Sequence, residues 1–179
     1  MNFSSELIEK IRQIKLVILD VDGVLTDGTI WLGESEELKG FDVQDGAGVK
    51  YLIRAGLQVA ILTGRDSVAV SRRAKELTVD ICLQGQKVKL PAFEKIVELA
   101  DVNASETACM GDDLTDLPLL QRCGLFIAPA NAVPEIRERT DIITKAAGGH
   151  GAVREAAEII LKTQGKWKII LERYLEVQS

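Results

Sequence analysis

Hydrophobic residues along the chain gather in short uninterrupted runs. Apolar runs of this length are typical of strands that are buried on both faces of a sheet. The pattern predicts strands within 15–20, 57–64, 79–85, 107–113 and 125–128, and a sixth at 141–145.

Between these runs, apolar residues recur at helical spacing. Helices are predicted from Ser4 or Ser5 to Ile14, over 45–56, over 66–77 with Asp66 or Ser67 as the cap, over 88–101 with Pro91 in the first turn, over 114–124, and from Ala152 onward. Strand and helix alternate at the spacing of βαβ units. We therefore predict an α/β fold with a Rossmann-like, mostly parallel sheet and helices on both faces.

The segment after the first strand departs from this alternation. Residues 28–43 alternate apolar and polar positions around Gly33 to Glu36, which predicts a small β-hairpin insertion with its turn there. The rest of the chain is consistent with one domain over 1–179. Gly165 is expected to separate a C-terminal helix or tail, 165–179, from the preceding helix.

Composition narrows the class of protein. The net charge is −5 and no apolar run approaches the roughly 18 residues that span a bilayer, so we expect no nucleic-acid or membrane partner. The first residues lack the basic and apolar regions of a signal peptide. Three cysteines without CxxC spacing are typical of buried thiols, and together these features predict a cytoplasmic protein.

Polar residues that could take part in binding or catalysis follow three of the predicted strands. Asp20 and Asp22 come after the first strand, Thr63 and Gly64 after the second, and Asp112 after the fourth. The carboxyl ends of parallel strands meet at one edge of a sheet, where ligands bind in α/β proteins. Because carboxylates that lie close together repel one another, Asp20, Asp22 and Asp112 favour a bound Mg²⁺. The alternative is a turn with solvated acids.

A phosphate group would complete such a site. Thr63 and the Gly64 amide can donate to phosphate oxygens, and a lysine is available at Lys87 or Lys89. Lys89 is favoured because it begins a predicted helix, where anions are stabilised. Asp113 and Asp116 have two interpretations, as helix-capping acids or as groups that orient Lys89 and metal-bound water.

These stretches, "DVDGVLTDG", "LTGR", "VKL" and "GDDLTD", together resemble the four ordered motifs of the haloacid dehalogenase superfamily of phosphohydrolases. The resemblance implies that Asp20 attacks phosphorus and that Asp22 is the general acid and base. It implies Mg²⁺ held by the Asp20 and Asp112 carboxylates and the Asp22 carbonyl, with Thr63 and Lys89 on the phosphoryl oxygens.

No cap domain fits between the motifs. The stretches "DVDGVLTDGTIW", "FDVQDGAGV", "NAVPEI" and "GGHGAVRE" resemble the 3-deoxy-D-manno-octulosonate 8-phosphate phosphatase family, a capless branch. That resemblance implies a sugar-acid phosphate substrate and a homotetramer in which hairpins complete neighbouring sites. Ile30, Trp31 and Leu32 suit such a contact, although they could instead pack on their own domain.

Substrate contacts implied by position are Gly64, Arg65, Gly148, Gly149 and His150. Arg65 could clamp the carboxylate of a sugar acid, or could pair with a surface acid instead. The family often has arginine where Gln44 stands, and arginine or lysine where His150 stands, which leaves the identity of the sugar acid open.

Three alternatives remain at this stage. The substrate could be a nine-carbon sugar-acid 9-phosphate. The chain could be a receiver-type signalling module, although such modules place the acid pair before the phosphorylated aspartate. It could also be a catalytically silent oligomerisation domain.

Overall fold

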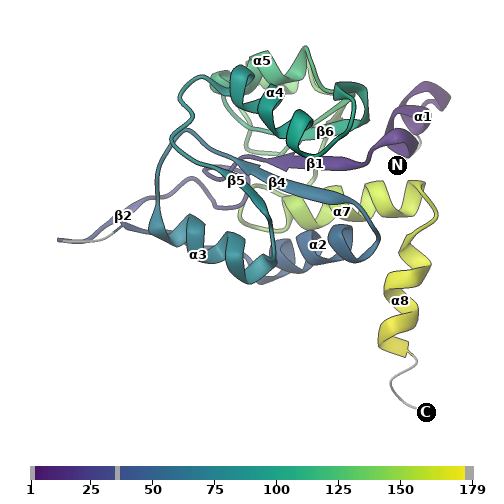
Figure 1. Ribbon diagram of the computed structural model, residues 1–179, viewed down its shortest axis with the longest axis horizontal. Coiled ribbons are helices and arrows are strands. Elements are labelled where there is room, and N and C mark those ends of the chain that lie inside the picture. Colours follow the sequence, from purple (N-terminus) through teal and green to yellow (C-terminus); the bar gives the residue numbers. More distant parts are fainter. Residues whose placement is uncertain (1–2, 35–36, 176–179) are drawn as a thin grey trace.

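A computed structural model describes residues 3–34 and 37–175. Its centre is a six-stranded sheet in the order β5-β4-β1-β6-β7-β8, in which every pair of neighbours is parallel (Figure 1). The strands are β1 (Leu16–Leu19), β4 (Gln58–Leu62), β5 (Ile81–Leu83), β6 (Thr107–Met110), β7 (Leu125–Ala128) and β8 (Ile142–Ile143). All six predicted strands are therefore present, and the predicted Rossmann-like fold is confirmed.

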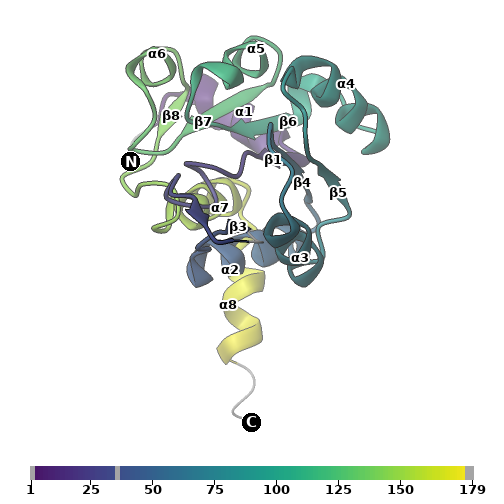
Figure 2. The ribbon, with the colours of Figure 1, turned by 90° about the vertical axis from the view of Figure 1, so that its left-hand side faces the viewer.

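Helices cover both faces of this sheet (Figure 2). On one face lie α4 (Lys89–Leu99), α5 (Leu117–Leu120) and α6 (Pro134–Arg137), and on the other lie α2 (Val43–Arg54), α3 (Val68–Leu77) and α7 (Ala152–Thr163). The short 3-10 helices η1 (Ala104–Glu106) and η2 (Leu114–Asp116) precede β6 and α5. The helix α1 (Ser5–Gln13) contacts α7 beside the sheet.

The burial of β1 explains why its sequence is apolar without interruption. Val17 and Leu19 belong to the core beneath α2, α3 and α7, whereas Leu16 and Ile18 belong to the core beneath α4 and α5. Alternate side chains of a strand point to opposite faces, so a strand covered on both sides needs apolar residues at every position.

Most predicted helices begin and end close to their expected positions. The Ser4 hydroxyl caps α1, and Pro91 lies in the first turn of α4, where its missing N–H breaks no helical hydrogen bond. Ser67 is the N-cap residue of α3, but its hydroxyl makes no capping bond. The short helix α6 was not predicted.

The hairpin between β1 and α2 is small. It pairs β2 (Trp31–Leu32) with β3 (Glu37–Leu38) and projects away from the domain (Figure 1). Of its predicted turn, residues 35–36 lie outside the described part of the chain. Trp31 is 64% and Leu32 79% exposed, so they do not pack on their own domain. Within the described residues, no larger insertion serves as a cap.

The C-terminal helix α8 (Trp167–Leu175) extends from the body of the domain (Figure 1). It follows Gly165, as predicted, and is attached through Tyr51, whose ring meets Trp167 and Tyr174 edge-on at 5.8 and 6.1 Å. The Arg154 guanidinium lies 4.7 Å from the centre of the Tyr51 ring. Residues 176–179 of the predicted tail lie outside the described part.

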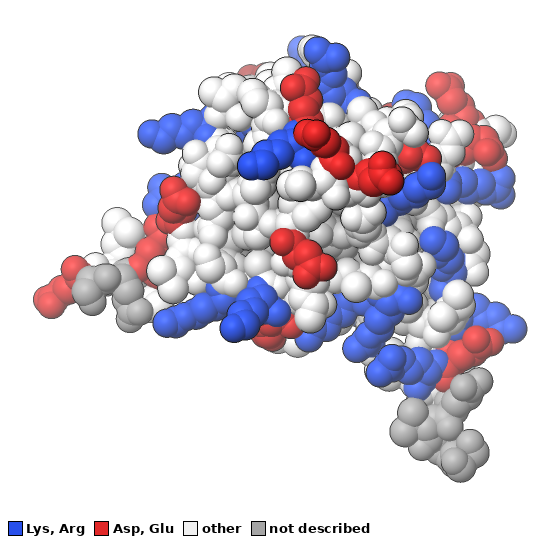
Figure 3. Space-filling model, in the orientation of Figure 1, with Lys and Arg blue, Asp and Glu red and all other residues white. Residues whose placement is uncertain are grey.

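Acidic and basic side chains are both scattered over the face drawn in Figure 3, around a wide area of uncharged residues. In the described ranges, none of the helices has the length and apolar character needed to cross a membrane. Cys82, Cys109 and Cys123 are all free thiols.

Candidate active site

A pocket of about 440 Å³ opens at the carboxyl ends of the central strands. It is bounded by the loops that follow β1, β4, β5 and β6, so one edge of the sheet collects residues from four distant parts of the sequence. The predicted residues that line it are Asp20, Asp22, Thr63, Gly64, Arg65, Lys87, Lys89, Asp112 and Asp113. Gly23, Gly28, Gln86 and Thr115, which the sequence analysis did not single out, also line it.

Lys89 joins two acids at the base of this pocket. Its Nζ lies 2.7 Å from Asp20 Oδ2 and 2.6 Å from Asp116 Oδ1, and its side chain is 2% exposed. Burial opposes the charge of Lys89, but the two carboxylates together outweigh it and raise the pKa above the usual value. Lys89 is therefore a fixed cation beside Asp20.

Asp116 holds this arrangement in place. Its Oδ2 accepts hydrogen bonds from the amides of Asp112 (3.2 Å) and Asp113 (3.4 Å), while Oδ1 accepts from Lys89. Asp113 is exposed and caps the turn η2 through the amide of Leu114. Of the two acids predicted to orient Lys89, only Asp116 contacts it, and Asp113 matches the capping alternative.

The Asp112 carboxylate faces the loop after β1. A side chain on Gly23, whose φ is +78°, would collide with that carboxylate, so glycine is needed there both for conformation and for space. Among the described residues, no group donates a hydrogen bond to the Asp112 carboxylate or forms an ion pair with it. Burial and the nearby Asp20 raise the pKa of Asp112 to about 7.

Carboxylate oxygens of Asp20, Asp112 and Asp116 lie within 4.8 Å of one another. Burial raises the pKa of Asp20 to about 6, despite the neighbouring Lys89. Asp20 and Asp112 line the pocket, whereas Asp116 is fully buried and does not, so Asp20 and Asp112 are the carboxylates able to take a cation from it. This partly uncompensated acid pair fits a divalent ion that prefers hard oxygen ligands.

Thr63 and Gly64 line the same pocket on the loop after β4, the strand that neighbours β1. Thr63 is 2% exposed, and its backbone is held by hydrogen bonds to Leu83 and Gln86 of the next strand and loop. Its Oγ1 accepts only a long hydrogen bond of 3.4 Å from the Arg65 amide, so the hydroxyl proton remains available to a ligand. Lys87 lines the pocket but is exposed.

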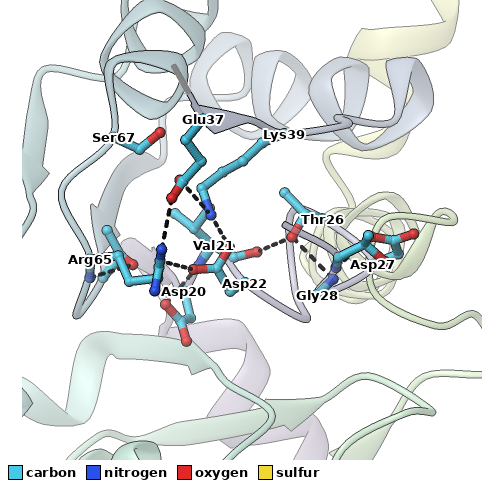
Figure 4. Close-up of polar contacts among 12 residues, drawn as sticks. Asp20, Val21, Asp22, Thr26, Asp27, Gly28, Glu37, Lys39, Arg65 and Ser67 are labelled. Atoms are coloured by element: carbon cyan, nitrogen blue, oxygen red, sulfur yellow. Dashed lines mark hydrogen bonds and ion pairs between the residues drawn. The ribbon is translucent and has the colours of Figure 1, made fainter. Parts of the chain in front are cut away.

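Strand β3 of the hairpin and the residue after it add two residues that sequence reasoning missed (Figure 4). Lys39 binds Asp22 Oδ1 and lies 3.2 Å from Glu37 Oε1. Arg65 binds Glu37 Oε2 at 2.7 Å, and its Nε lies 3.9 Å from Asp22 Oδ2. No periodicity marks these positions, because their roles depend on how the hairpin folds back onto the site.

The glycine loop does not reach the pocket in this chain. The Gly149 amide donates to the Val24 carbonyl at 3.0 Å, and a side chain on Gly148 would collide with the backbone of Gly23. Asn131 connects the two loops, since its amide donates to Gly23 O (3.0 Å) and accepts from Gly148 N (2.6 Å). His150 is exposed. The expected substrate contacts of Gly148, Gly149 and His150 stay predictions.

The chain was then compared with known proteins. A family model for haloacid dehalogenase-like hydrolases matches residues 83–155. The 3-deoxy-D-manno-octulosonate 8-phosphate phosphatase KdsC of Escherichia coli strain K12 is 43% identical over 164 residues, which cover 91% of this chain and 87% of that protein. The chain belongs to the 3-deoxy-D-manno-octulosonate 8-phosphate phosphatase family.

Solved structures agree with membership of this phosphatase family. The Moraxella catarrhalis enzyme, in complex with magnesium, phosphate and a KDO molecule, aligns with a TM-score of 0.91 at 40% identity, covering 94% of this chain and 98% of that one. The cobalt-bound Haemophilus influenzae enzyme aligns with a TM-score of 0.86 at 42% identity, covering 88% and 92%. The predicted superfamily and its capless branch are confirmed, and the chain is a phosphoric monoester hydrolase.

Proposed function

We propose that the protein is a Mg²⁺-dependent phosphatase that hydrolyses 3-deoxy-D-manno-octulosonate 8-phosphate through an aspartyl-phosphate on Asp20. One observation carries the proposal: Asp20 is buried between a fixed cation, Lys89, and the partnerless carboxylate of Asp112. This environment suits a nucleophile that must approach a charged phosphate, and family membership supplies the substrate class.

In the first step, a carboxylate oxygen of Asp20 forms a bond to phosphorus while the bond from phosphorus to the sugar oxygen breaks. Asp22 gives its proton to the departing oxygen, which leaves as the alcohol. Lys89 and the Thr63 hydroxyl, on the pocket wall, would stabilise the charge on the other phosphoryl oxygens.

In the second step, water attacks phosphorus and Asp22 removes a proton from that water. The bond between Asp20 and phosphorus breaks, and inorganic phosphate leaves with both aspartates restored. Asp116 takes no direct part, because both its oxygens are occupied in holding Lys89 and the loop after β6.

Asp20 and Asp112 would hold the metal through their carboxylates, and the Asp22 carbonyl would add a third oxygen. Bound there, Mg²⁺ would screen the repulsion between the nucleophile and the phosphate. Relatives in complex with magnesium and with cobalt support an ion of this class.

Arg65 is the group that we expect to recognise the sugar acid. Its guanidinium is half-exposed at the pocket wall and is held by Glu37 in the absence of substrate. A substrate carboxylate could replace Glu37 and accept two hydrogen bonds from the Arg65 guanidinium. A nine-carbon sugar-acid 9-phosphate carries the same two anionic groups, so it is the second substrate to compare.

We further propose that the active assembly is a homotetramer in the cytoplasm. Exposed apolar side chains lie on the hairpin and near the starts of later helices: Trp31, Leu32 and Leu38, and Val43, Val68, Val88 and Leu114. Exposed apolar surface of this kind supports a covering subunit. The three free thiols support a reducing compartment.

A phosphate-release assay on a substrate panel tests the function. The panel contains the eight-carbon and nine-carbon sugar-acid phosphates, glycerol phosphate and p-nitrophenyl phosphate, each with and without EDTA. We expect the eight-carbon ester to have the highest kcat/KM and EDTA to abolish turnover. Equal kcat/KM for glycerol phosphate would contradict the substrate assignment.

The nucleophile is tested by Asp20→Asn with Asp27→Asn as the control. Asp27 lies on the same loop but is exposed and outside the pocket. Asp20→Asn should abolish phosphate release and leave the fold intact by circular dichroism, whereas Asp27→Asn should keep wild-type turnover. Native mass spectrometry of the same samples measures the number of subunits.

A further inference from the structure

Lys39 is a buried cation that the mechanism above does not use. Its side chain is only 1% exposed, although it belongs to a hairpin whose neighbouring residues Leu38 and Gly40 are exposed. Removing an ammonium from water is costly unless acids compensate for it, and lysine is among the residues least often found fully buried. The acids that contact Lys39 therefore indicate its role.

Those partners are Asp22 and Glu37. Lys39 Nζ donates to Asp22 Oδ1, and Glu37 Oε1 lies 3.2 Å from the same nitrogen. Glu37 also binds Arg65, and Arg65 lies beside Asp22 Oδ2. The four side chains form a closed ring of alternating charge over one end of the pocket (Figure 4).

We propose that Lys39 is the positioning residue for Asp22, and that it selects Oδ2 as the oxygen that exchanges the proton with substrate and water. This inference rests on the proposed function of Asp22. A lysine ammonium has only donors, so an oxygen that accepts from it cannot also carry the proton at that contact. An unprotonated oxygen is the better acceptor for the ammonium, so Lys39 favours the state in which Oδ1 accepts and Oδ2, on the Arg65 side, carries the proton.

The proton balance is simple, because Lys39 keeps its three protons throughout. In the first step the proton moves from Asp22 Oδ2 to the sugar oxygen as the bond from phosphorus to that oxygen breaks. In the second step a water proton returns to Oδ2 as the water oxygen bonds to phosphorus and the Asp20 oxygen leaves. Lys39 holds Asp22 in one rotamer during both transfers.

The experiment compares esters that differ in their need for an acid. A departing p-nitrophenolate is a stable anion, whereas a sugar alkoxide needs a proton. We measure kcat/KM, which reports steps up to the first irreversible one, for the sugar-acid phosphate, an alkyl phosphate, phenyl phosphate and p-nitrophenyl phosphate. The variant is Lys39→Met, which keeps the length of the side chain and removes its charge.

General acid catalysis contributes about 10²-fold or more, so Lys39→Met should lower kcat/KM for the two alkyl esters by about 10²-fold. The p-nitrophenyl ester should change little, and phenyl phosphate should fall between. Because esters are compared within one variant, a smaller folded fraction cancels from their ratio. An equal loss for every ester, or no loss for any, overturns the proposal.

The control is Lys10→Met, which removes another lysine–aspartate pair, Lys10 with Asp141 at 2.9 Å, far from the pocket. It should leave the ratios of kcat/KM among the four esters unchanged. If Lys39→Met does not fold, Lys39→Ala is used instead, because it leaves room for water. Added ethylammonium should then restore kcat/KM for the alkyl esters selectively. If it does not, and the ratios of kcat/KM among the esters in Lys39→Ala equal those of wild type, the role of Lys39 is refuted.

The failure of this proposal differs from failure of the proposed function. If Asp20→Asn still releases phosphate, the nucleophile is wrong and the test of Lys39 has lost its basis. If Asp20→Asn is inactive and Asp22→Asn selectively impairs the alkyl esters, the function holds. An unchanged ester ratio in Lys39→Met then contradicts only the positioning role.

Discussion

Removal of the divalent ion should change the stability of this protein in a pH-dependent way. The perturbed groups are Asp20 and Asp112, whose pKa values burial raises from 3.8 to about 6 and about 7. A raised pKa means that the folded protein binds protons more tightly than the unfolded chain. The metal-free protein therefore loses stability as pH rises from about 4 to about 7.

The size of the effect follows from these shifts. One pKa unit corresponds to about 1.4 kcal/mol, so the two groups together cost several kcal/mol above pH 7 without metal. At pH 8 both carboxylates are ready to bind an ion. Mg²⁺ at about 100 times its Kd then stabilises the fold by about 2.7 kcal/mol, which raises Tm by roughly 5–10 °C in a protein of this size.

Protons compete with the ion at low pH. At pH 5 Asp112, with a pKa of about 7, is ionised in about one molecule per hundred, and Asp20, with a pKa of about 6, in about one per ten. Together these protons weaken the apparent affinity about 1000-fold. The same Mg²⁺ concentration then contributes less than about 0.1 kcal/mol, so Tm hardly changes.

Calorimetry with Mg²⁺ or EDTA at pH 5, 6, 7 and 8 measures this difference in Tm. Asp112→Asn is the matched variant, because it keeps the shape of the side chain and removes its charge. It should be more stable than wild type in EDTA at pH 8 and should gain little from Mg²⁺. A Tm increase that is the same at pH 5 and pH 8, or that survives in Asp112→Asn, would refute this account of the site.

Three further variants probe the supports of the site. Lys89→Met should lower kcat by about 10²–10³-fold and destabilise the fold by about 3–5 kcal/mol at pH 8, measured by phosphate release and urea unfolding, because it leaves Asp20 and Asp116 buried without their cation. Gly23→Ala should abolish the Tm increase by Mg²⁺, because its methyl group displaces the Asp112 carboxylate. Asn131→Ala should cost about 1–3 kcal/mol in urea unfolding by breaking the link between Gly23 and Gly148. Wild-type values in any of these measurements would contradict the role given to that residue.

The residues that follow the central strands were predictable because a single geometric rule places them together. Asp20, Thr63 and Asp112 each follow a buried strand, and the ends of parallel strands meet at the same edge. Lys89 was predictable as the first residue of a helix that faces that edge. Local sequence patterns suffice where regular elements alone determine the position of a side chain.

The walls of the site were not predictable for the opposite reason. Lys39 reaches Asp22, and Glu37 reaches Lys39 and Arg65, only because a hairpin with two-residue strands folds back, and no pattern specifies that angle. The contact of the glycine loop with the loop after β1 was not predicted either: its glycines allow close backbone packing there. That packing depends on tertiary contacts, which the spacing of glycines does not reveal.

The two strands of the hairpin share the work that a cap domain performs elsewhere. Strand β3 and the residue after it contribute Glu37 and Lys39 to the ring of ion pairs that includes Asp22, within its own chain. Strand β2 presents Trp31 and Leu32, which pair with Leu38 and Glu37, to solvent, where the proposed neighbouring subunit would cover them. Since β2 and β3 pair over only two residues each, the hairpin has little stability of its own. Ion pairs of β3 and subunit contacts of β2 would then hold one short element from two sides, so assembly would also steady the residues that orient the general acid.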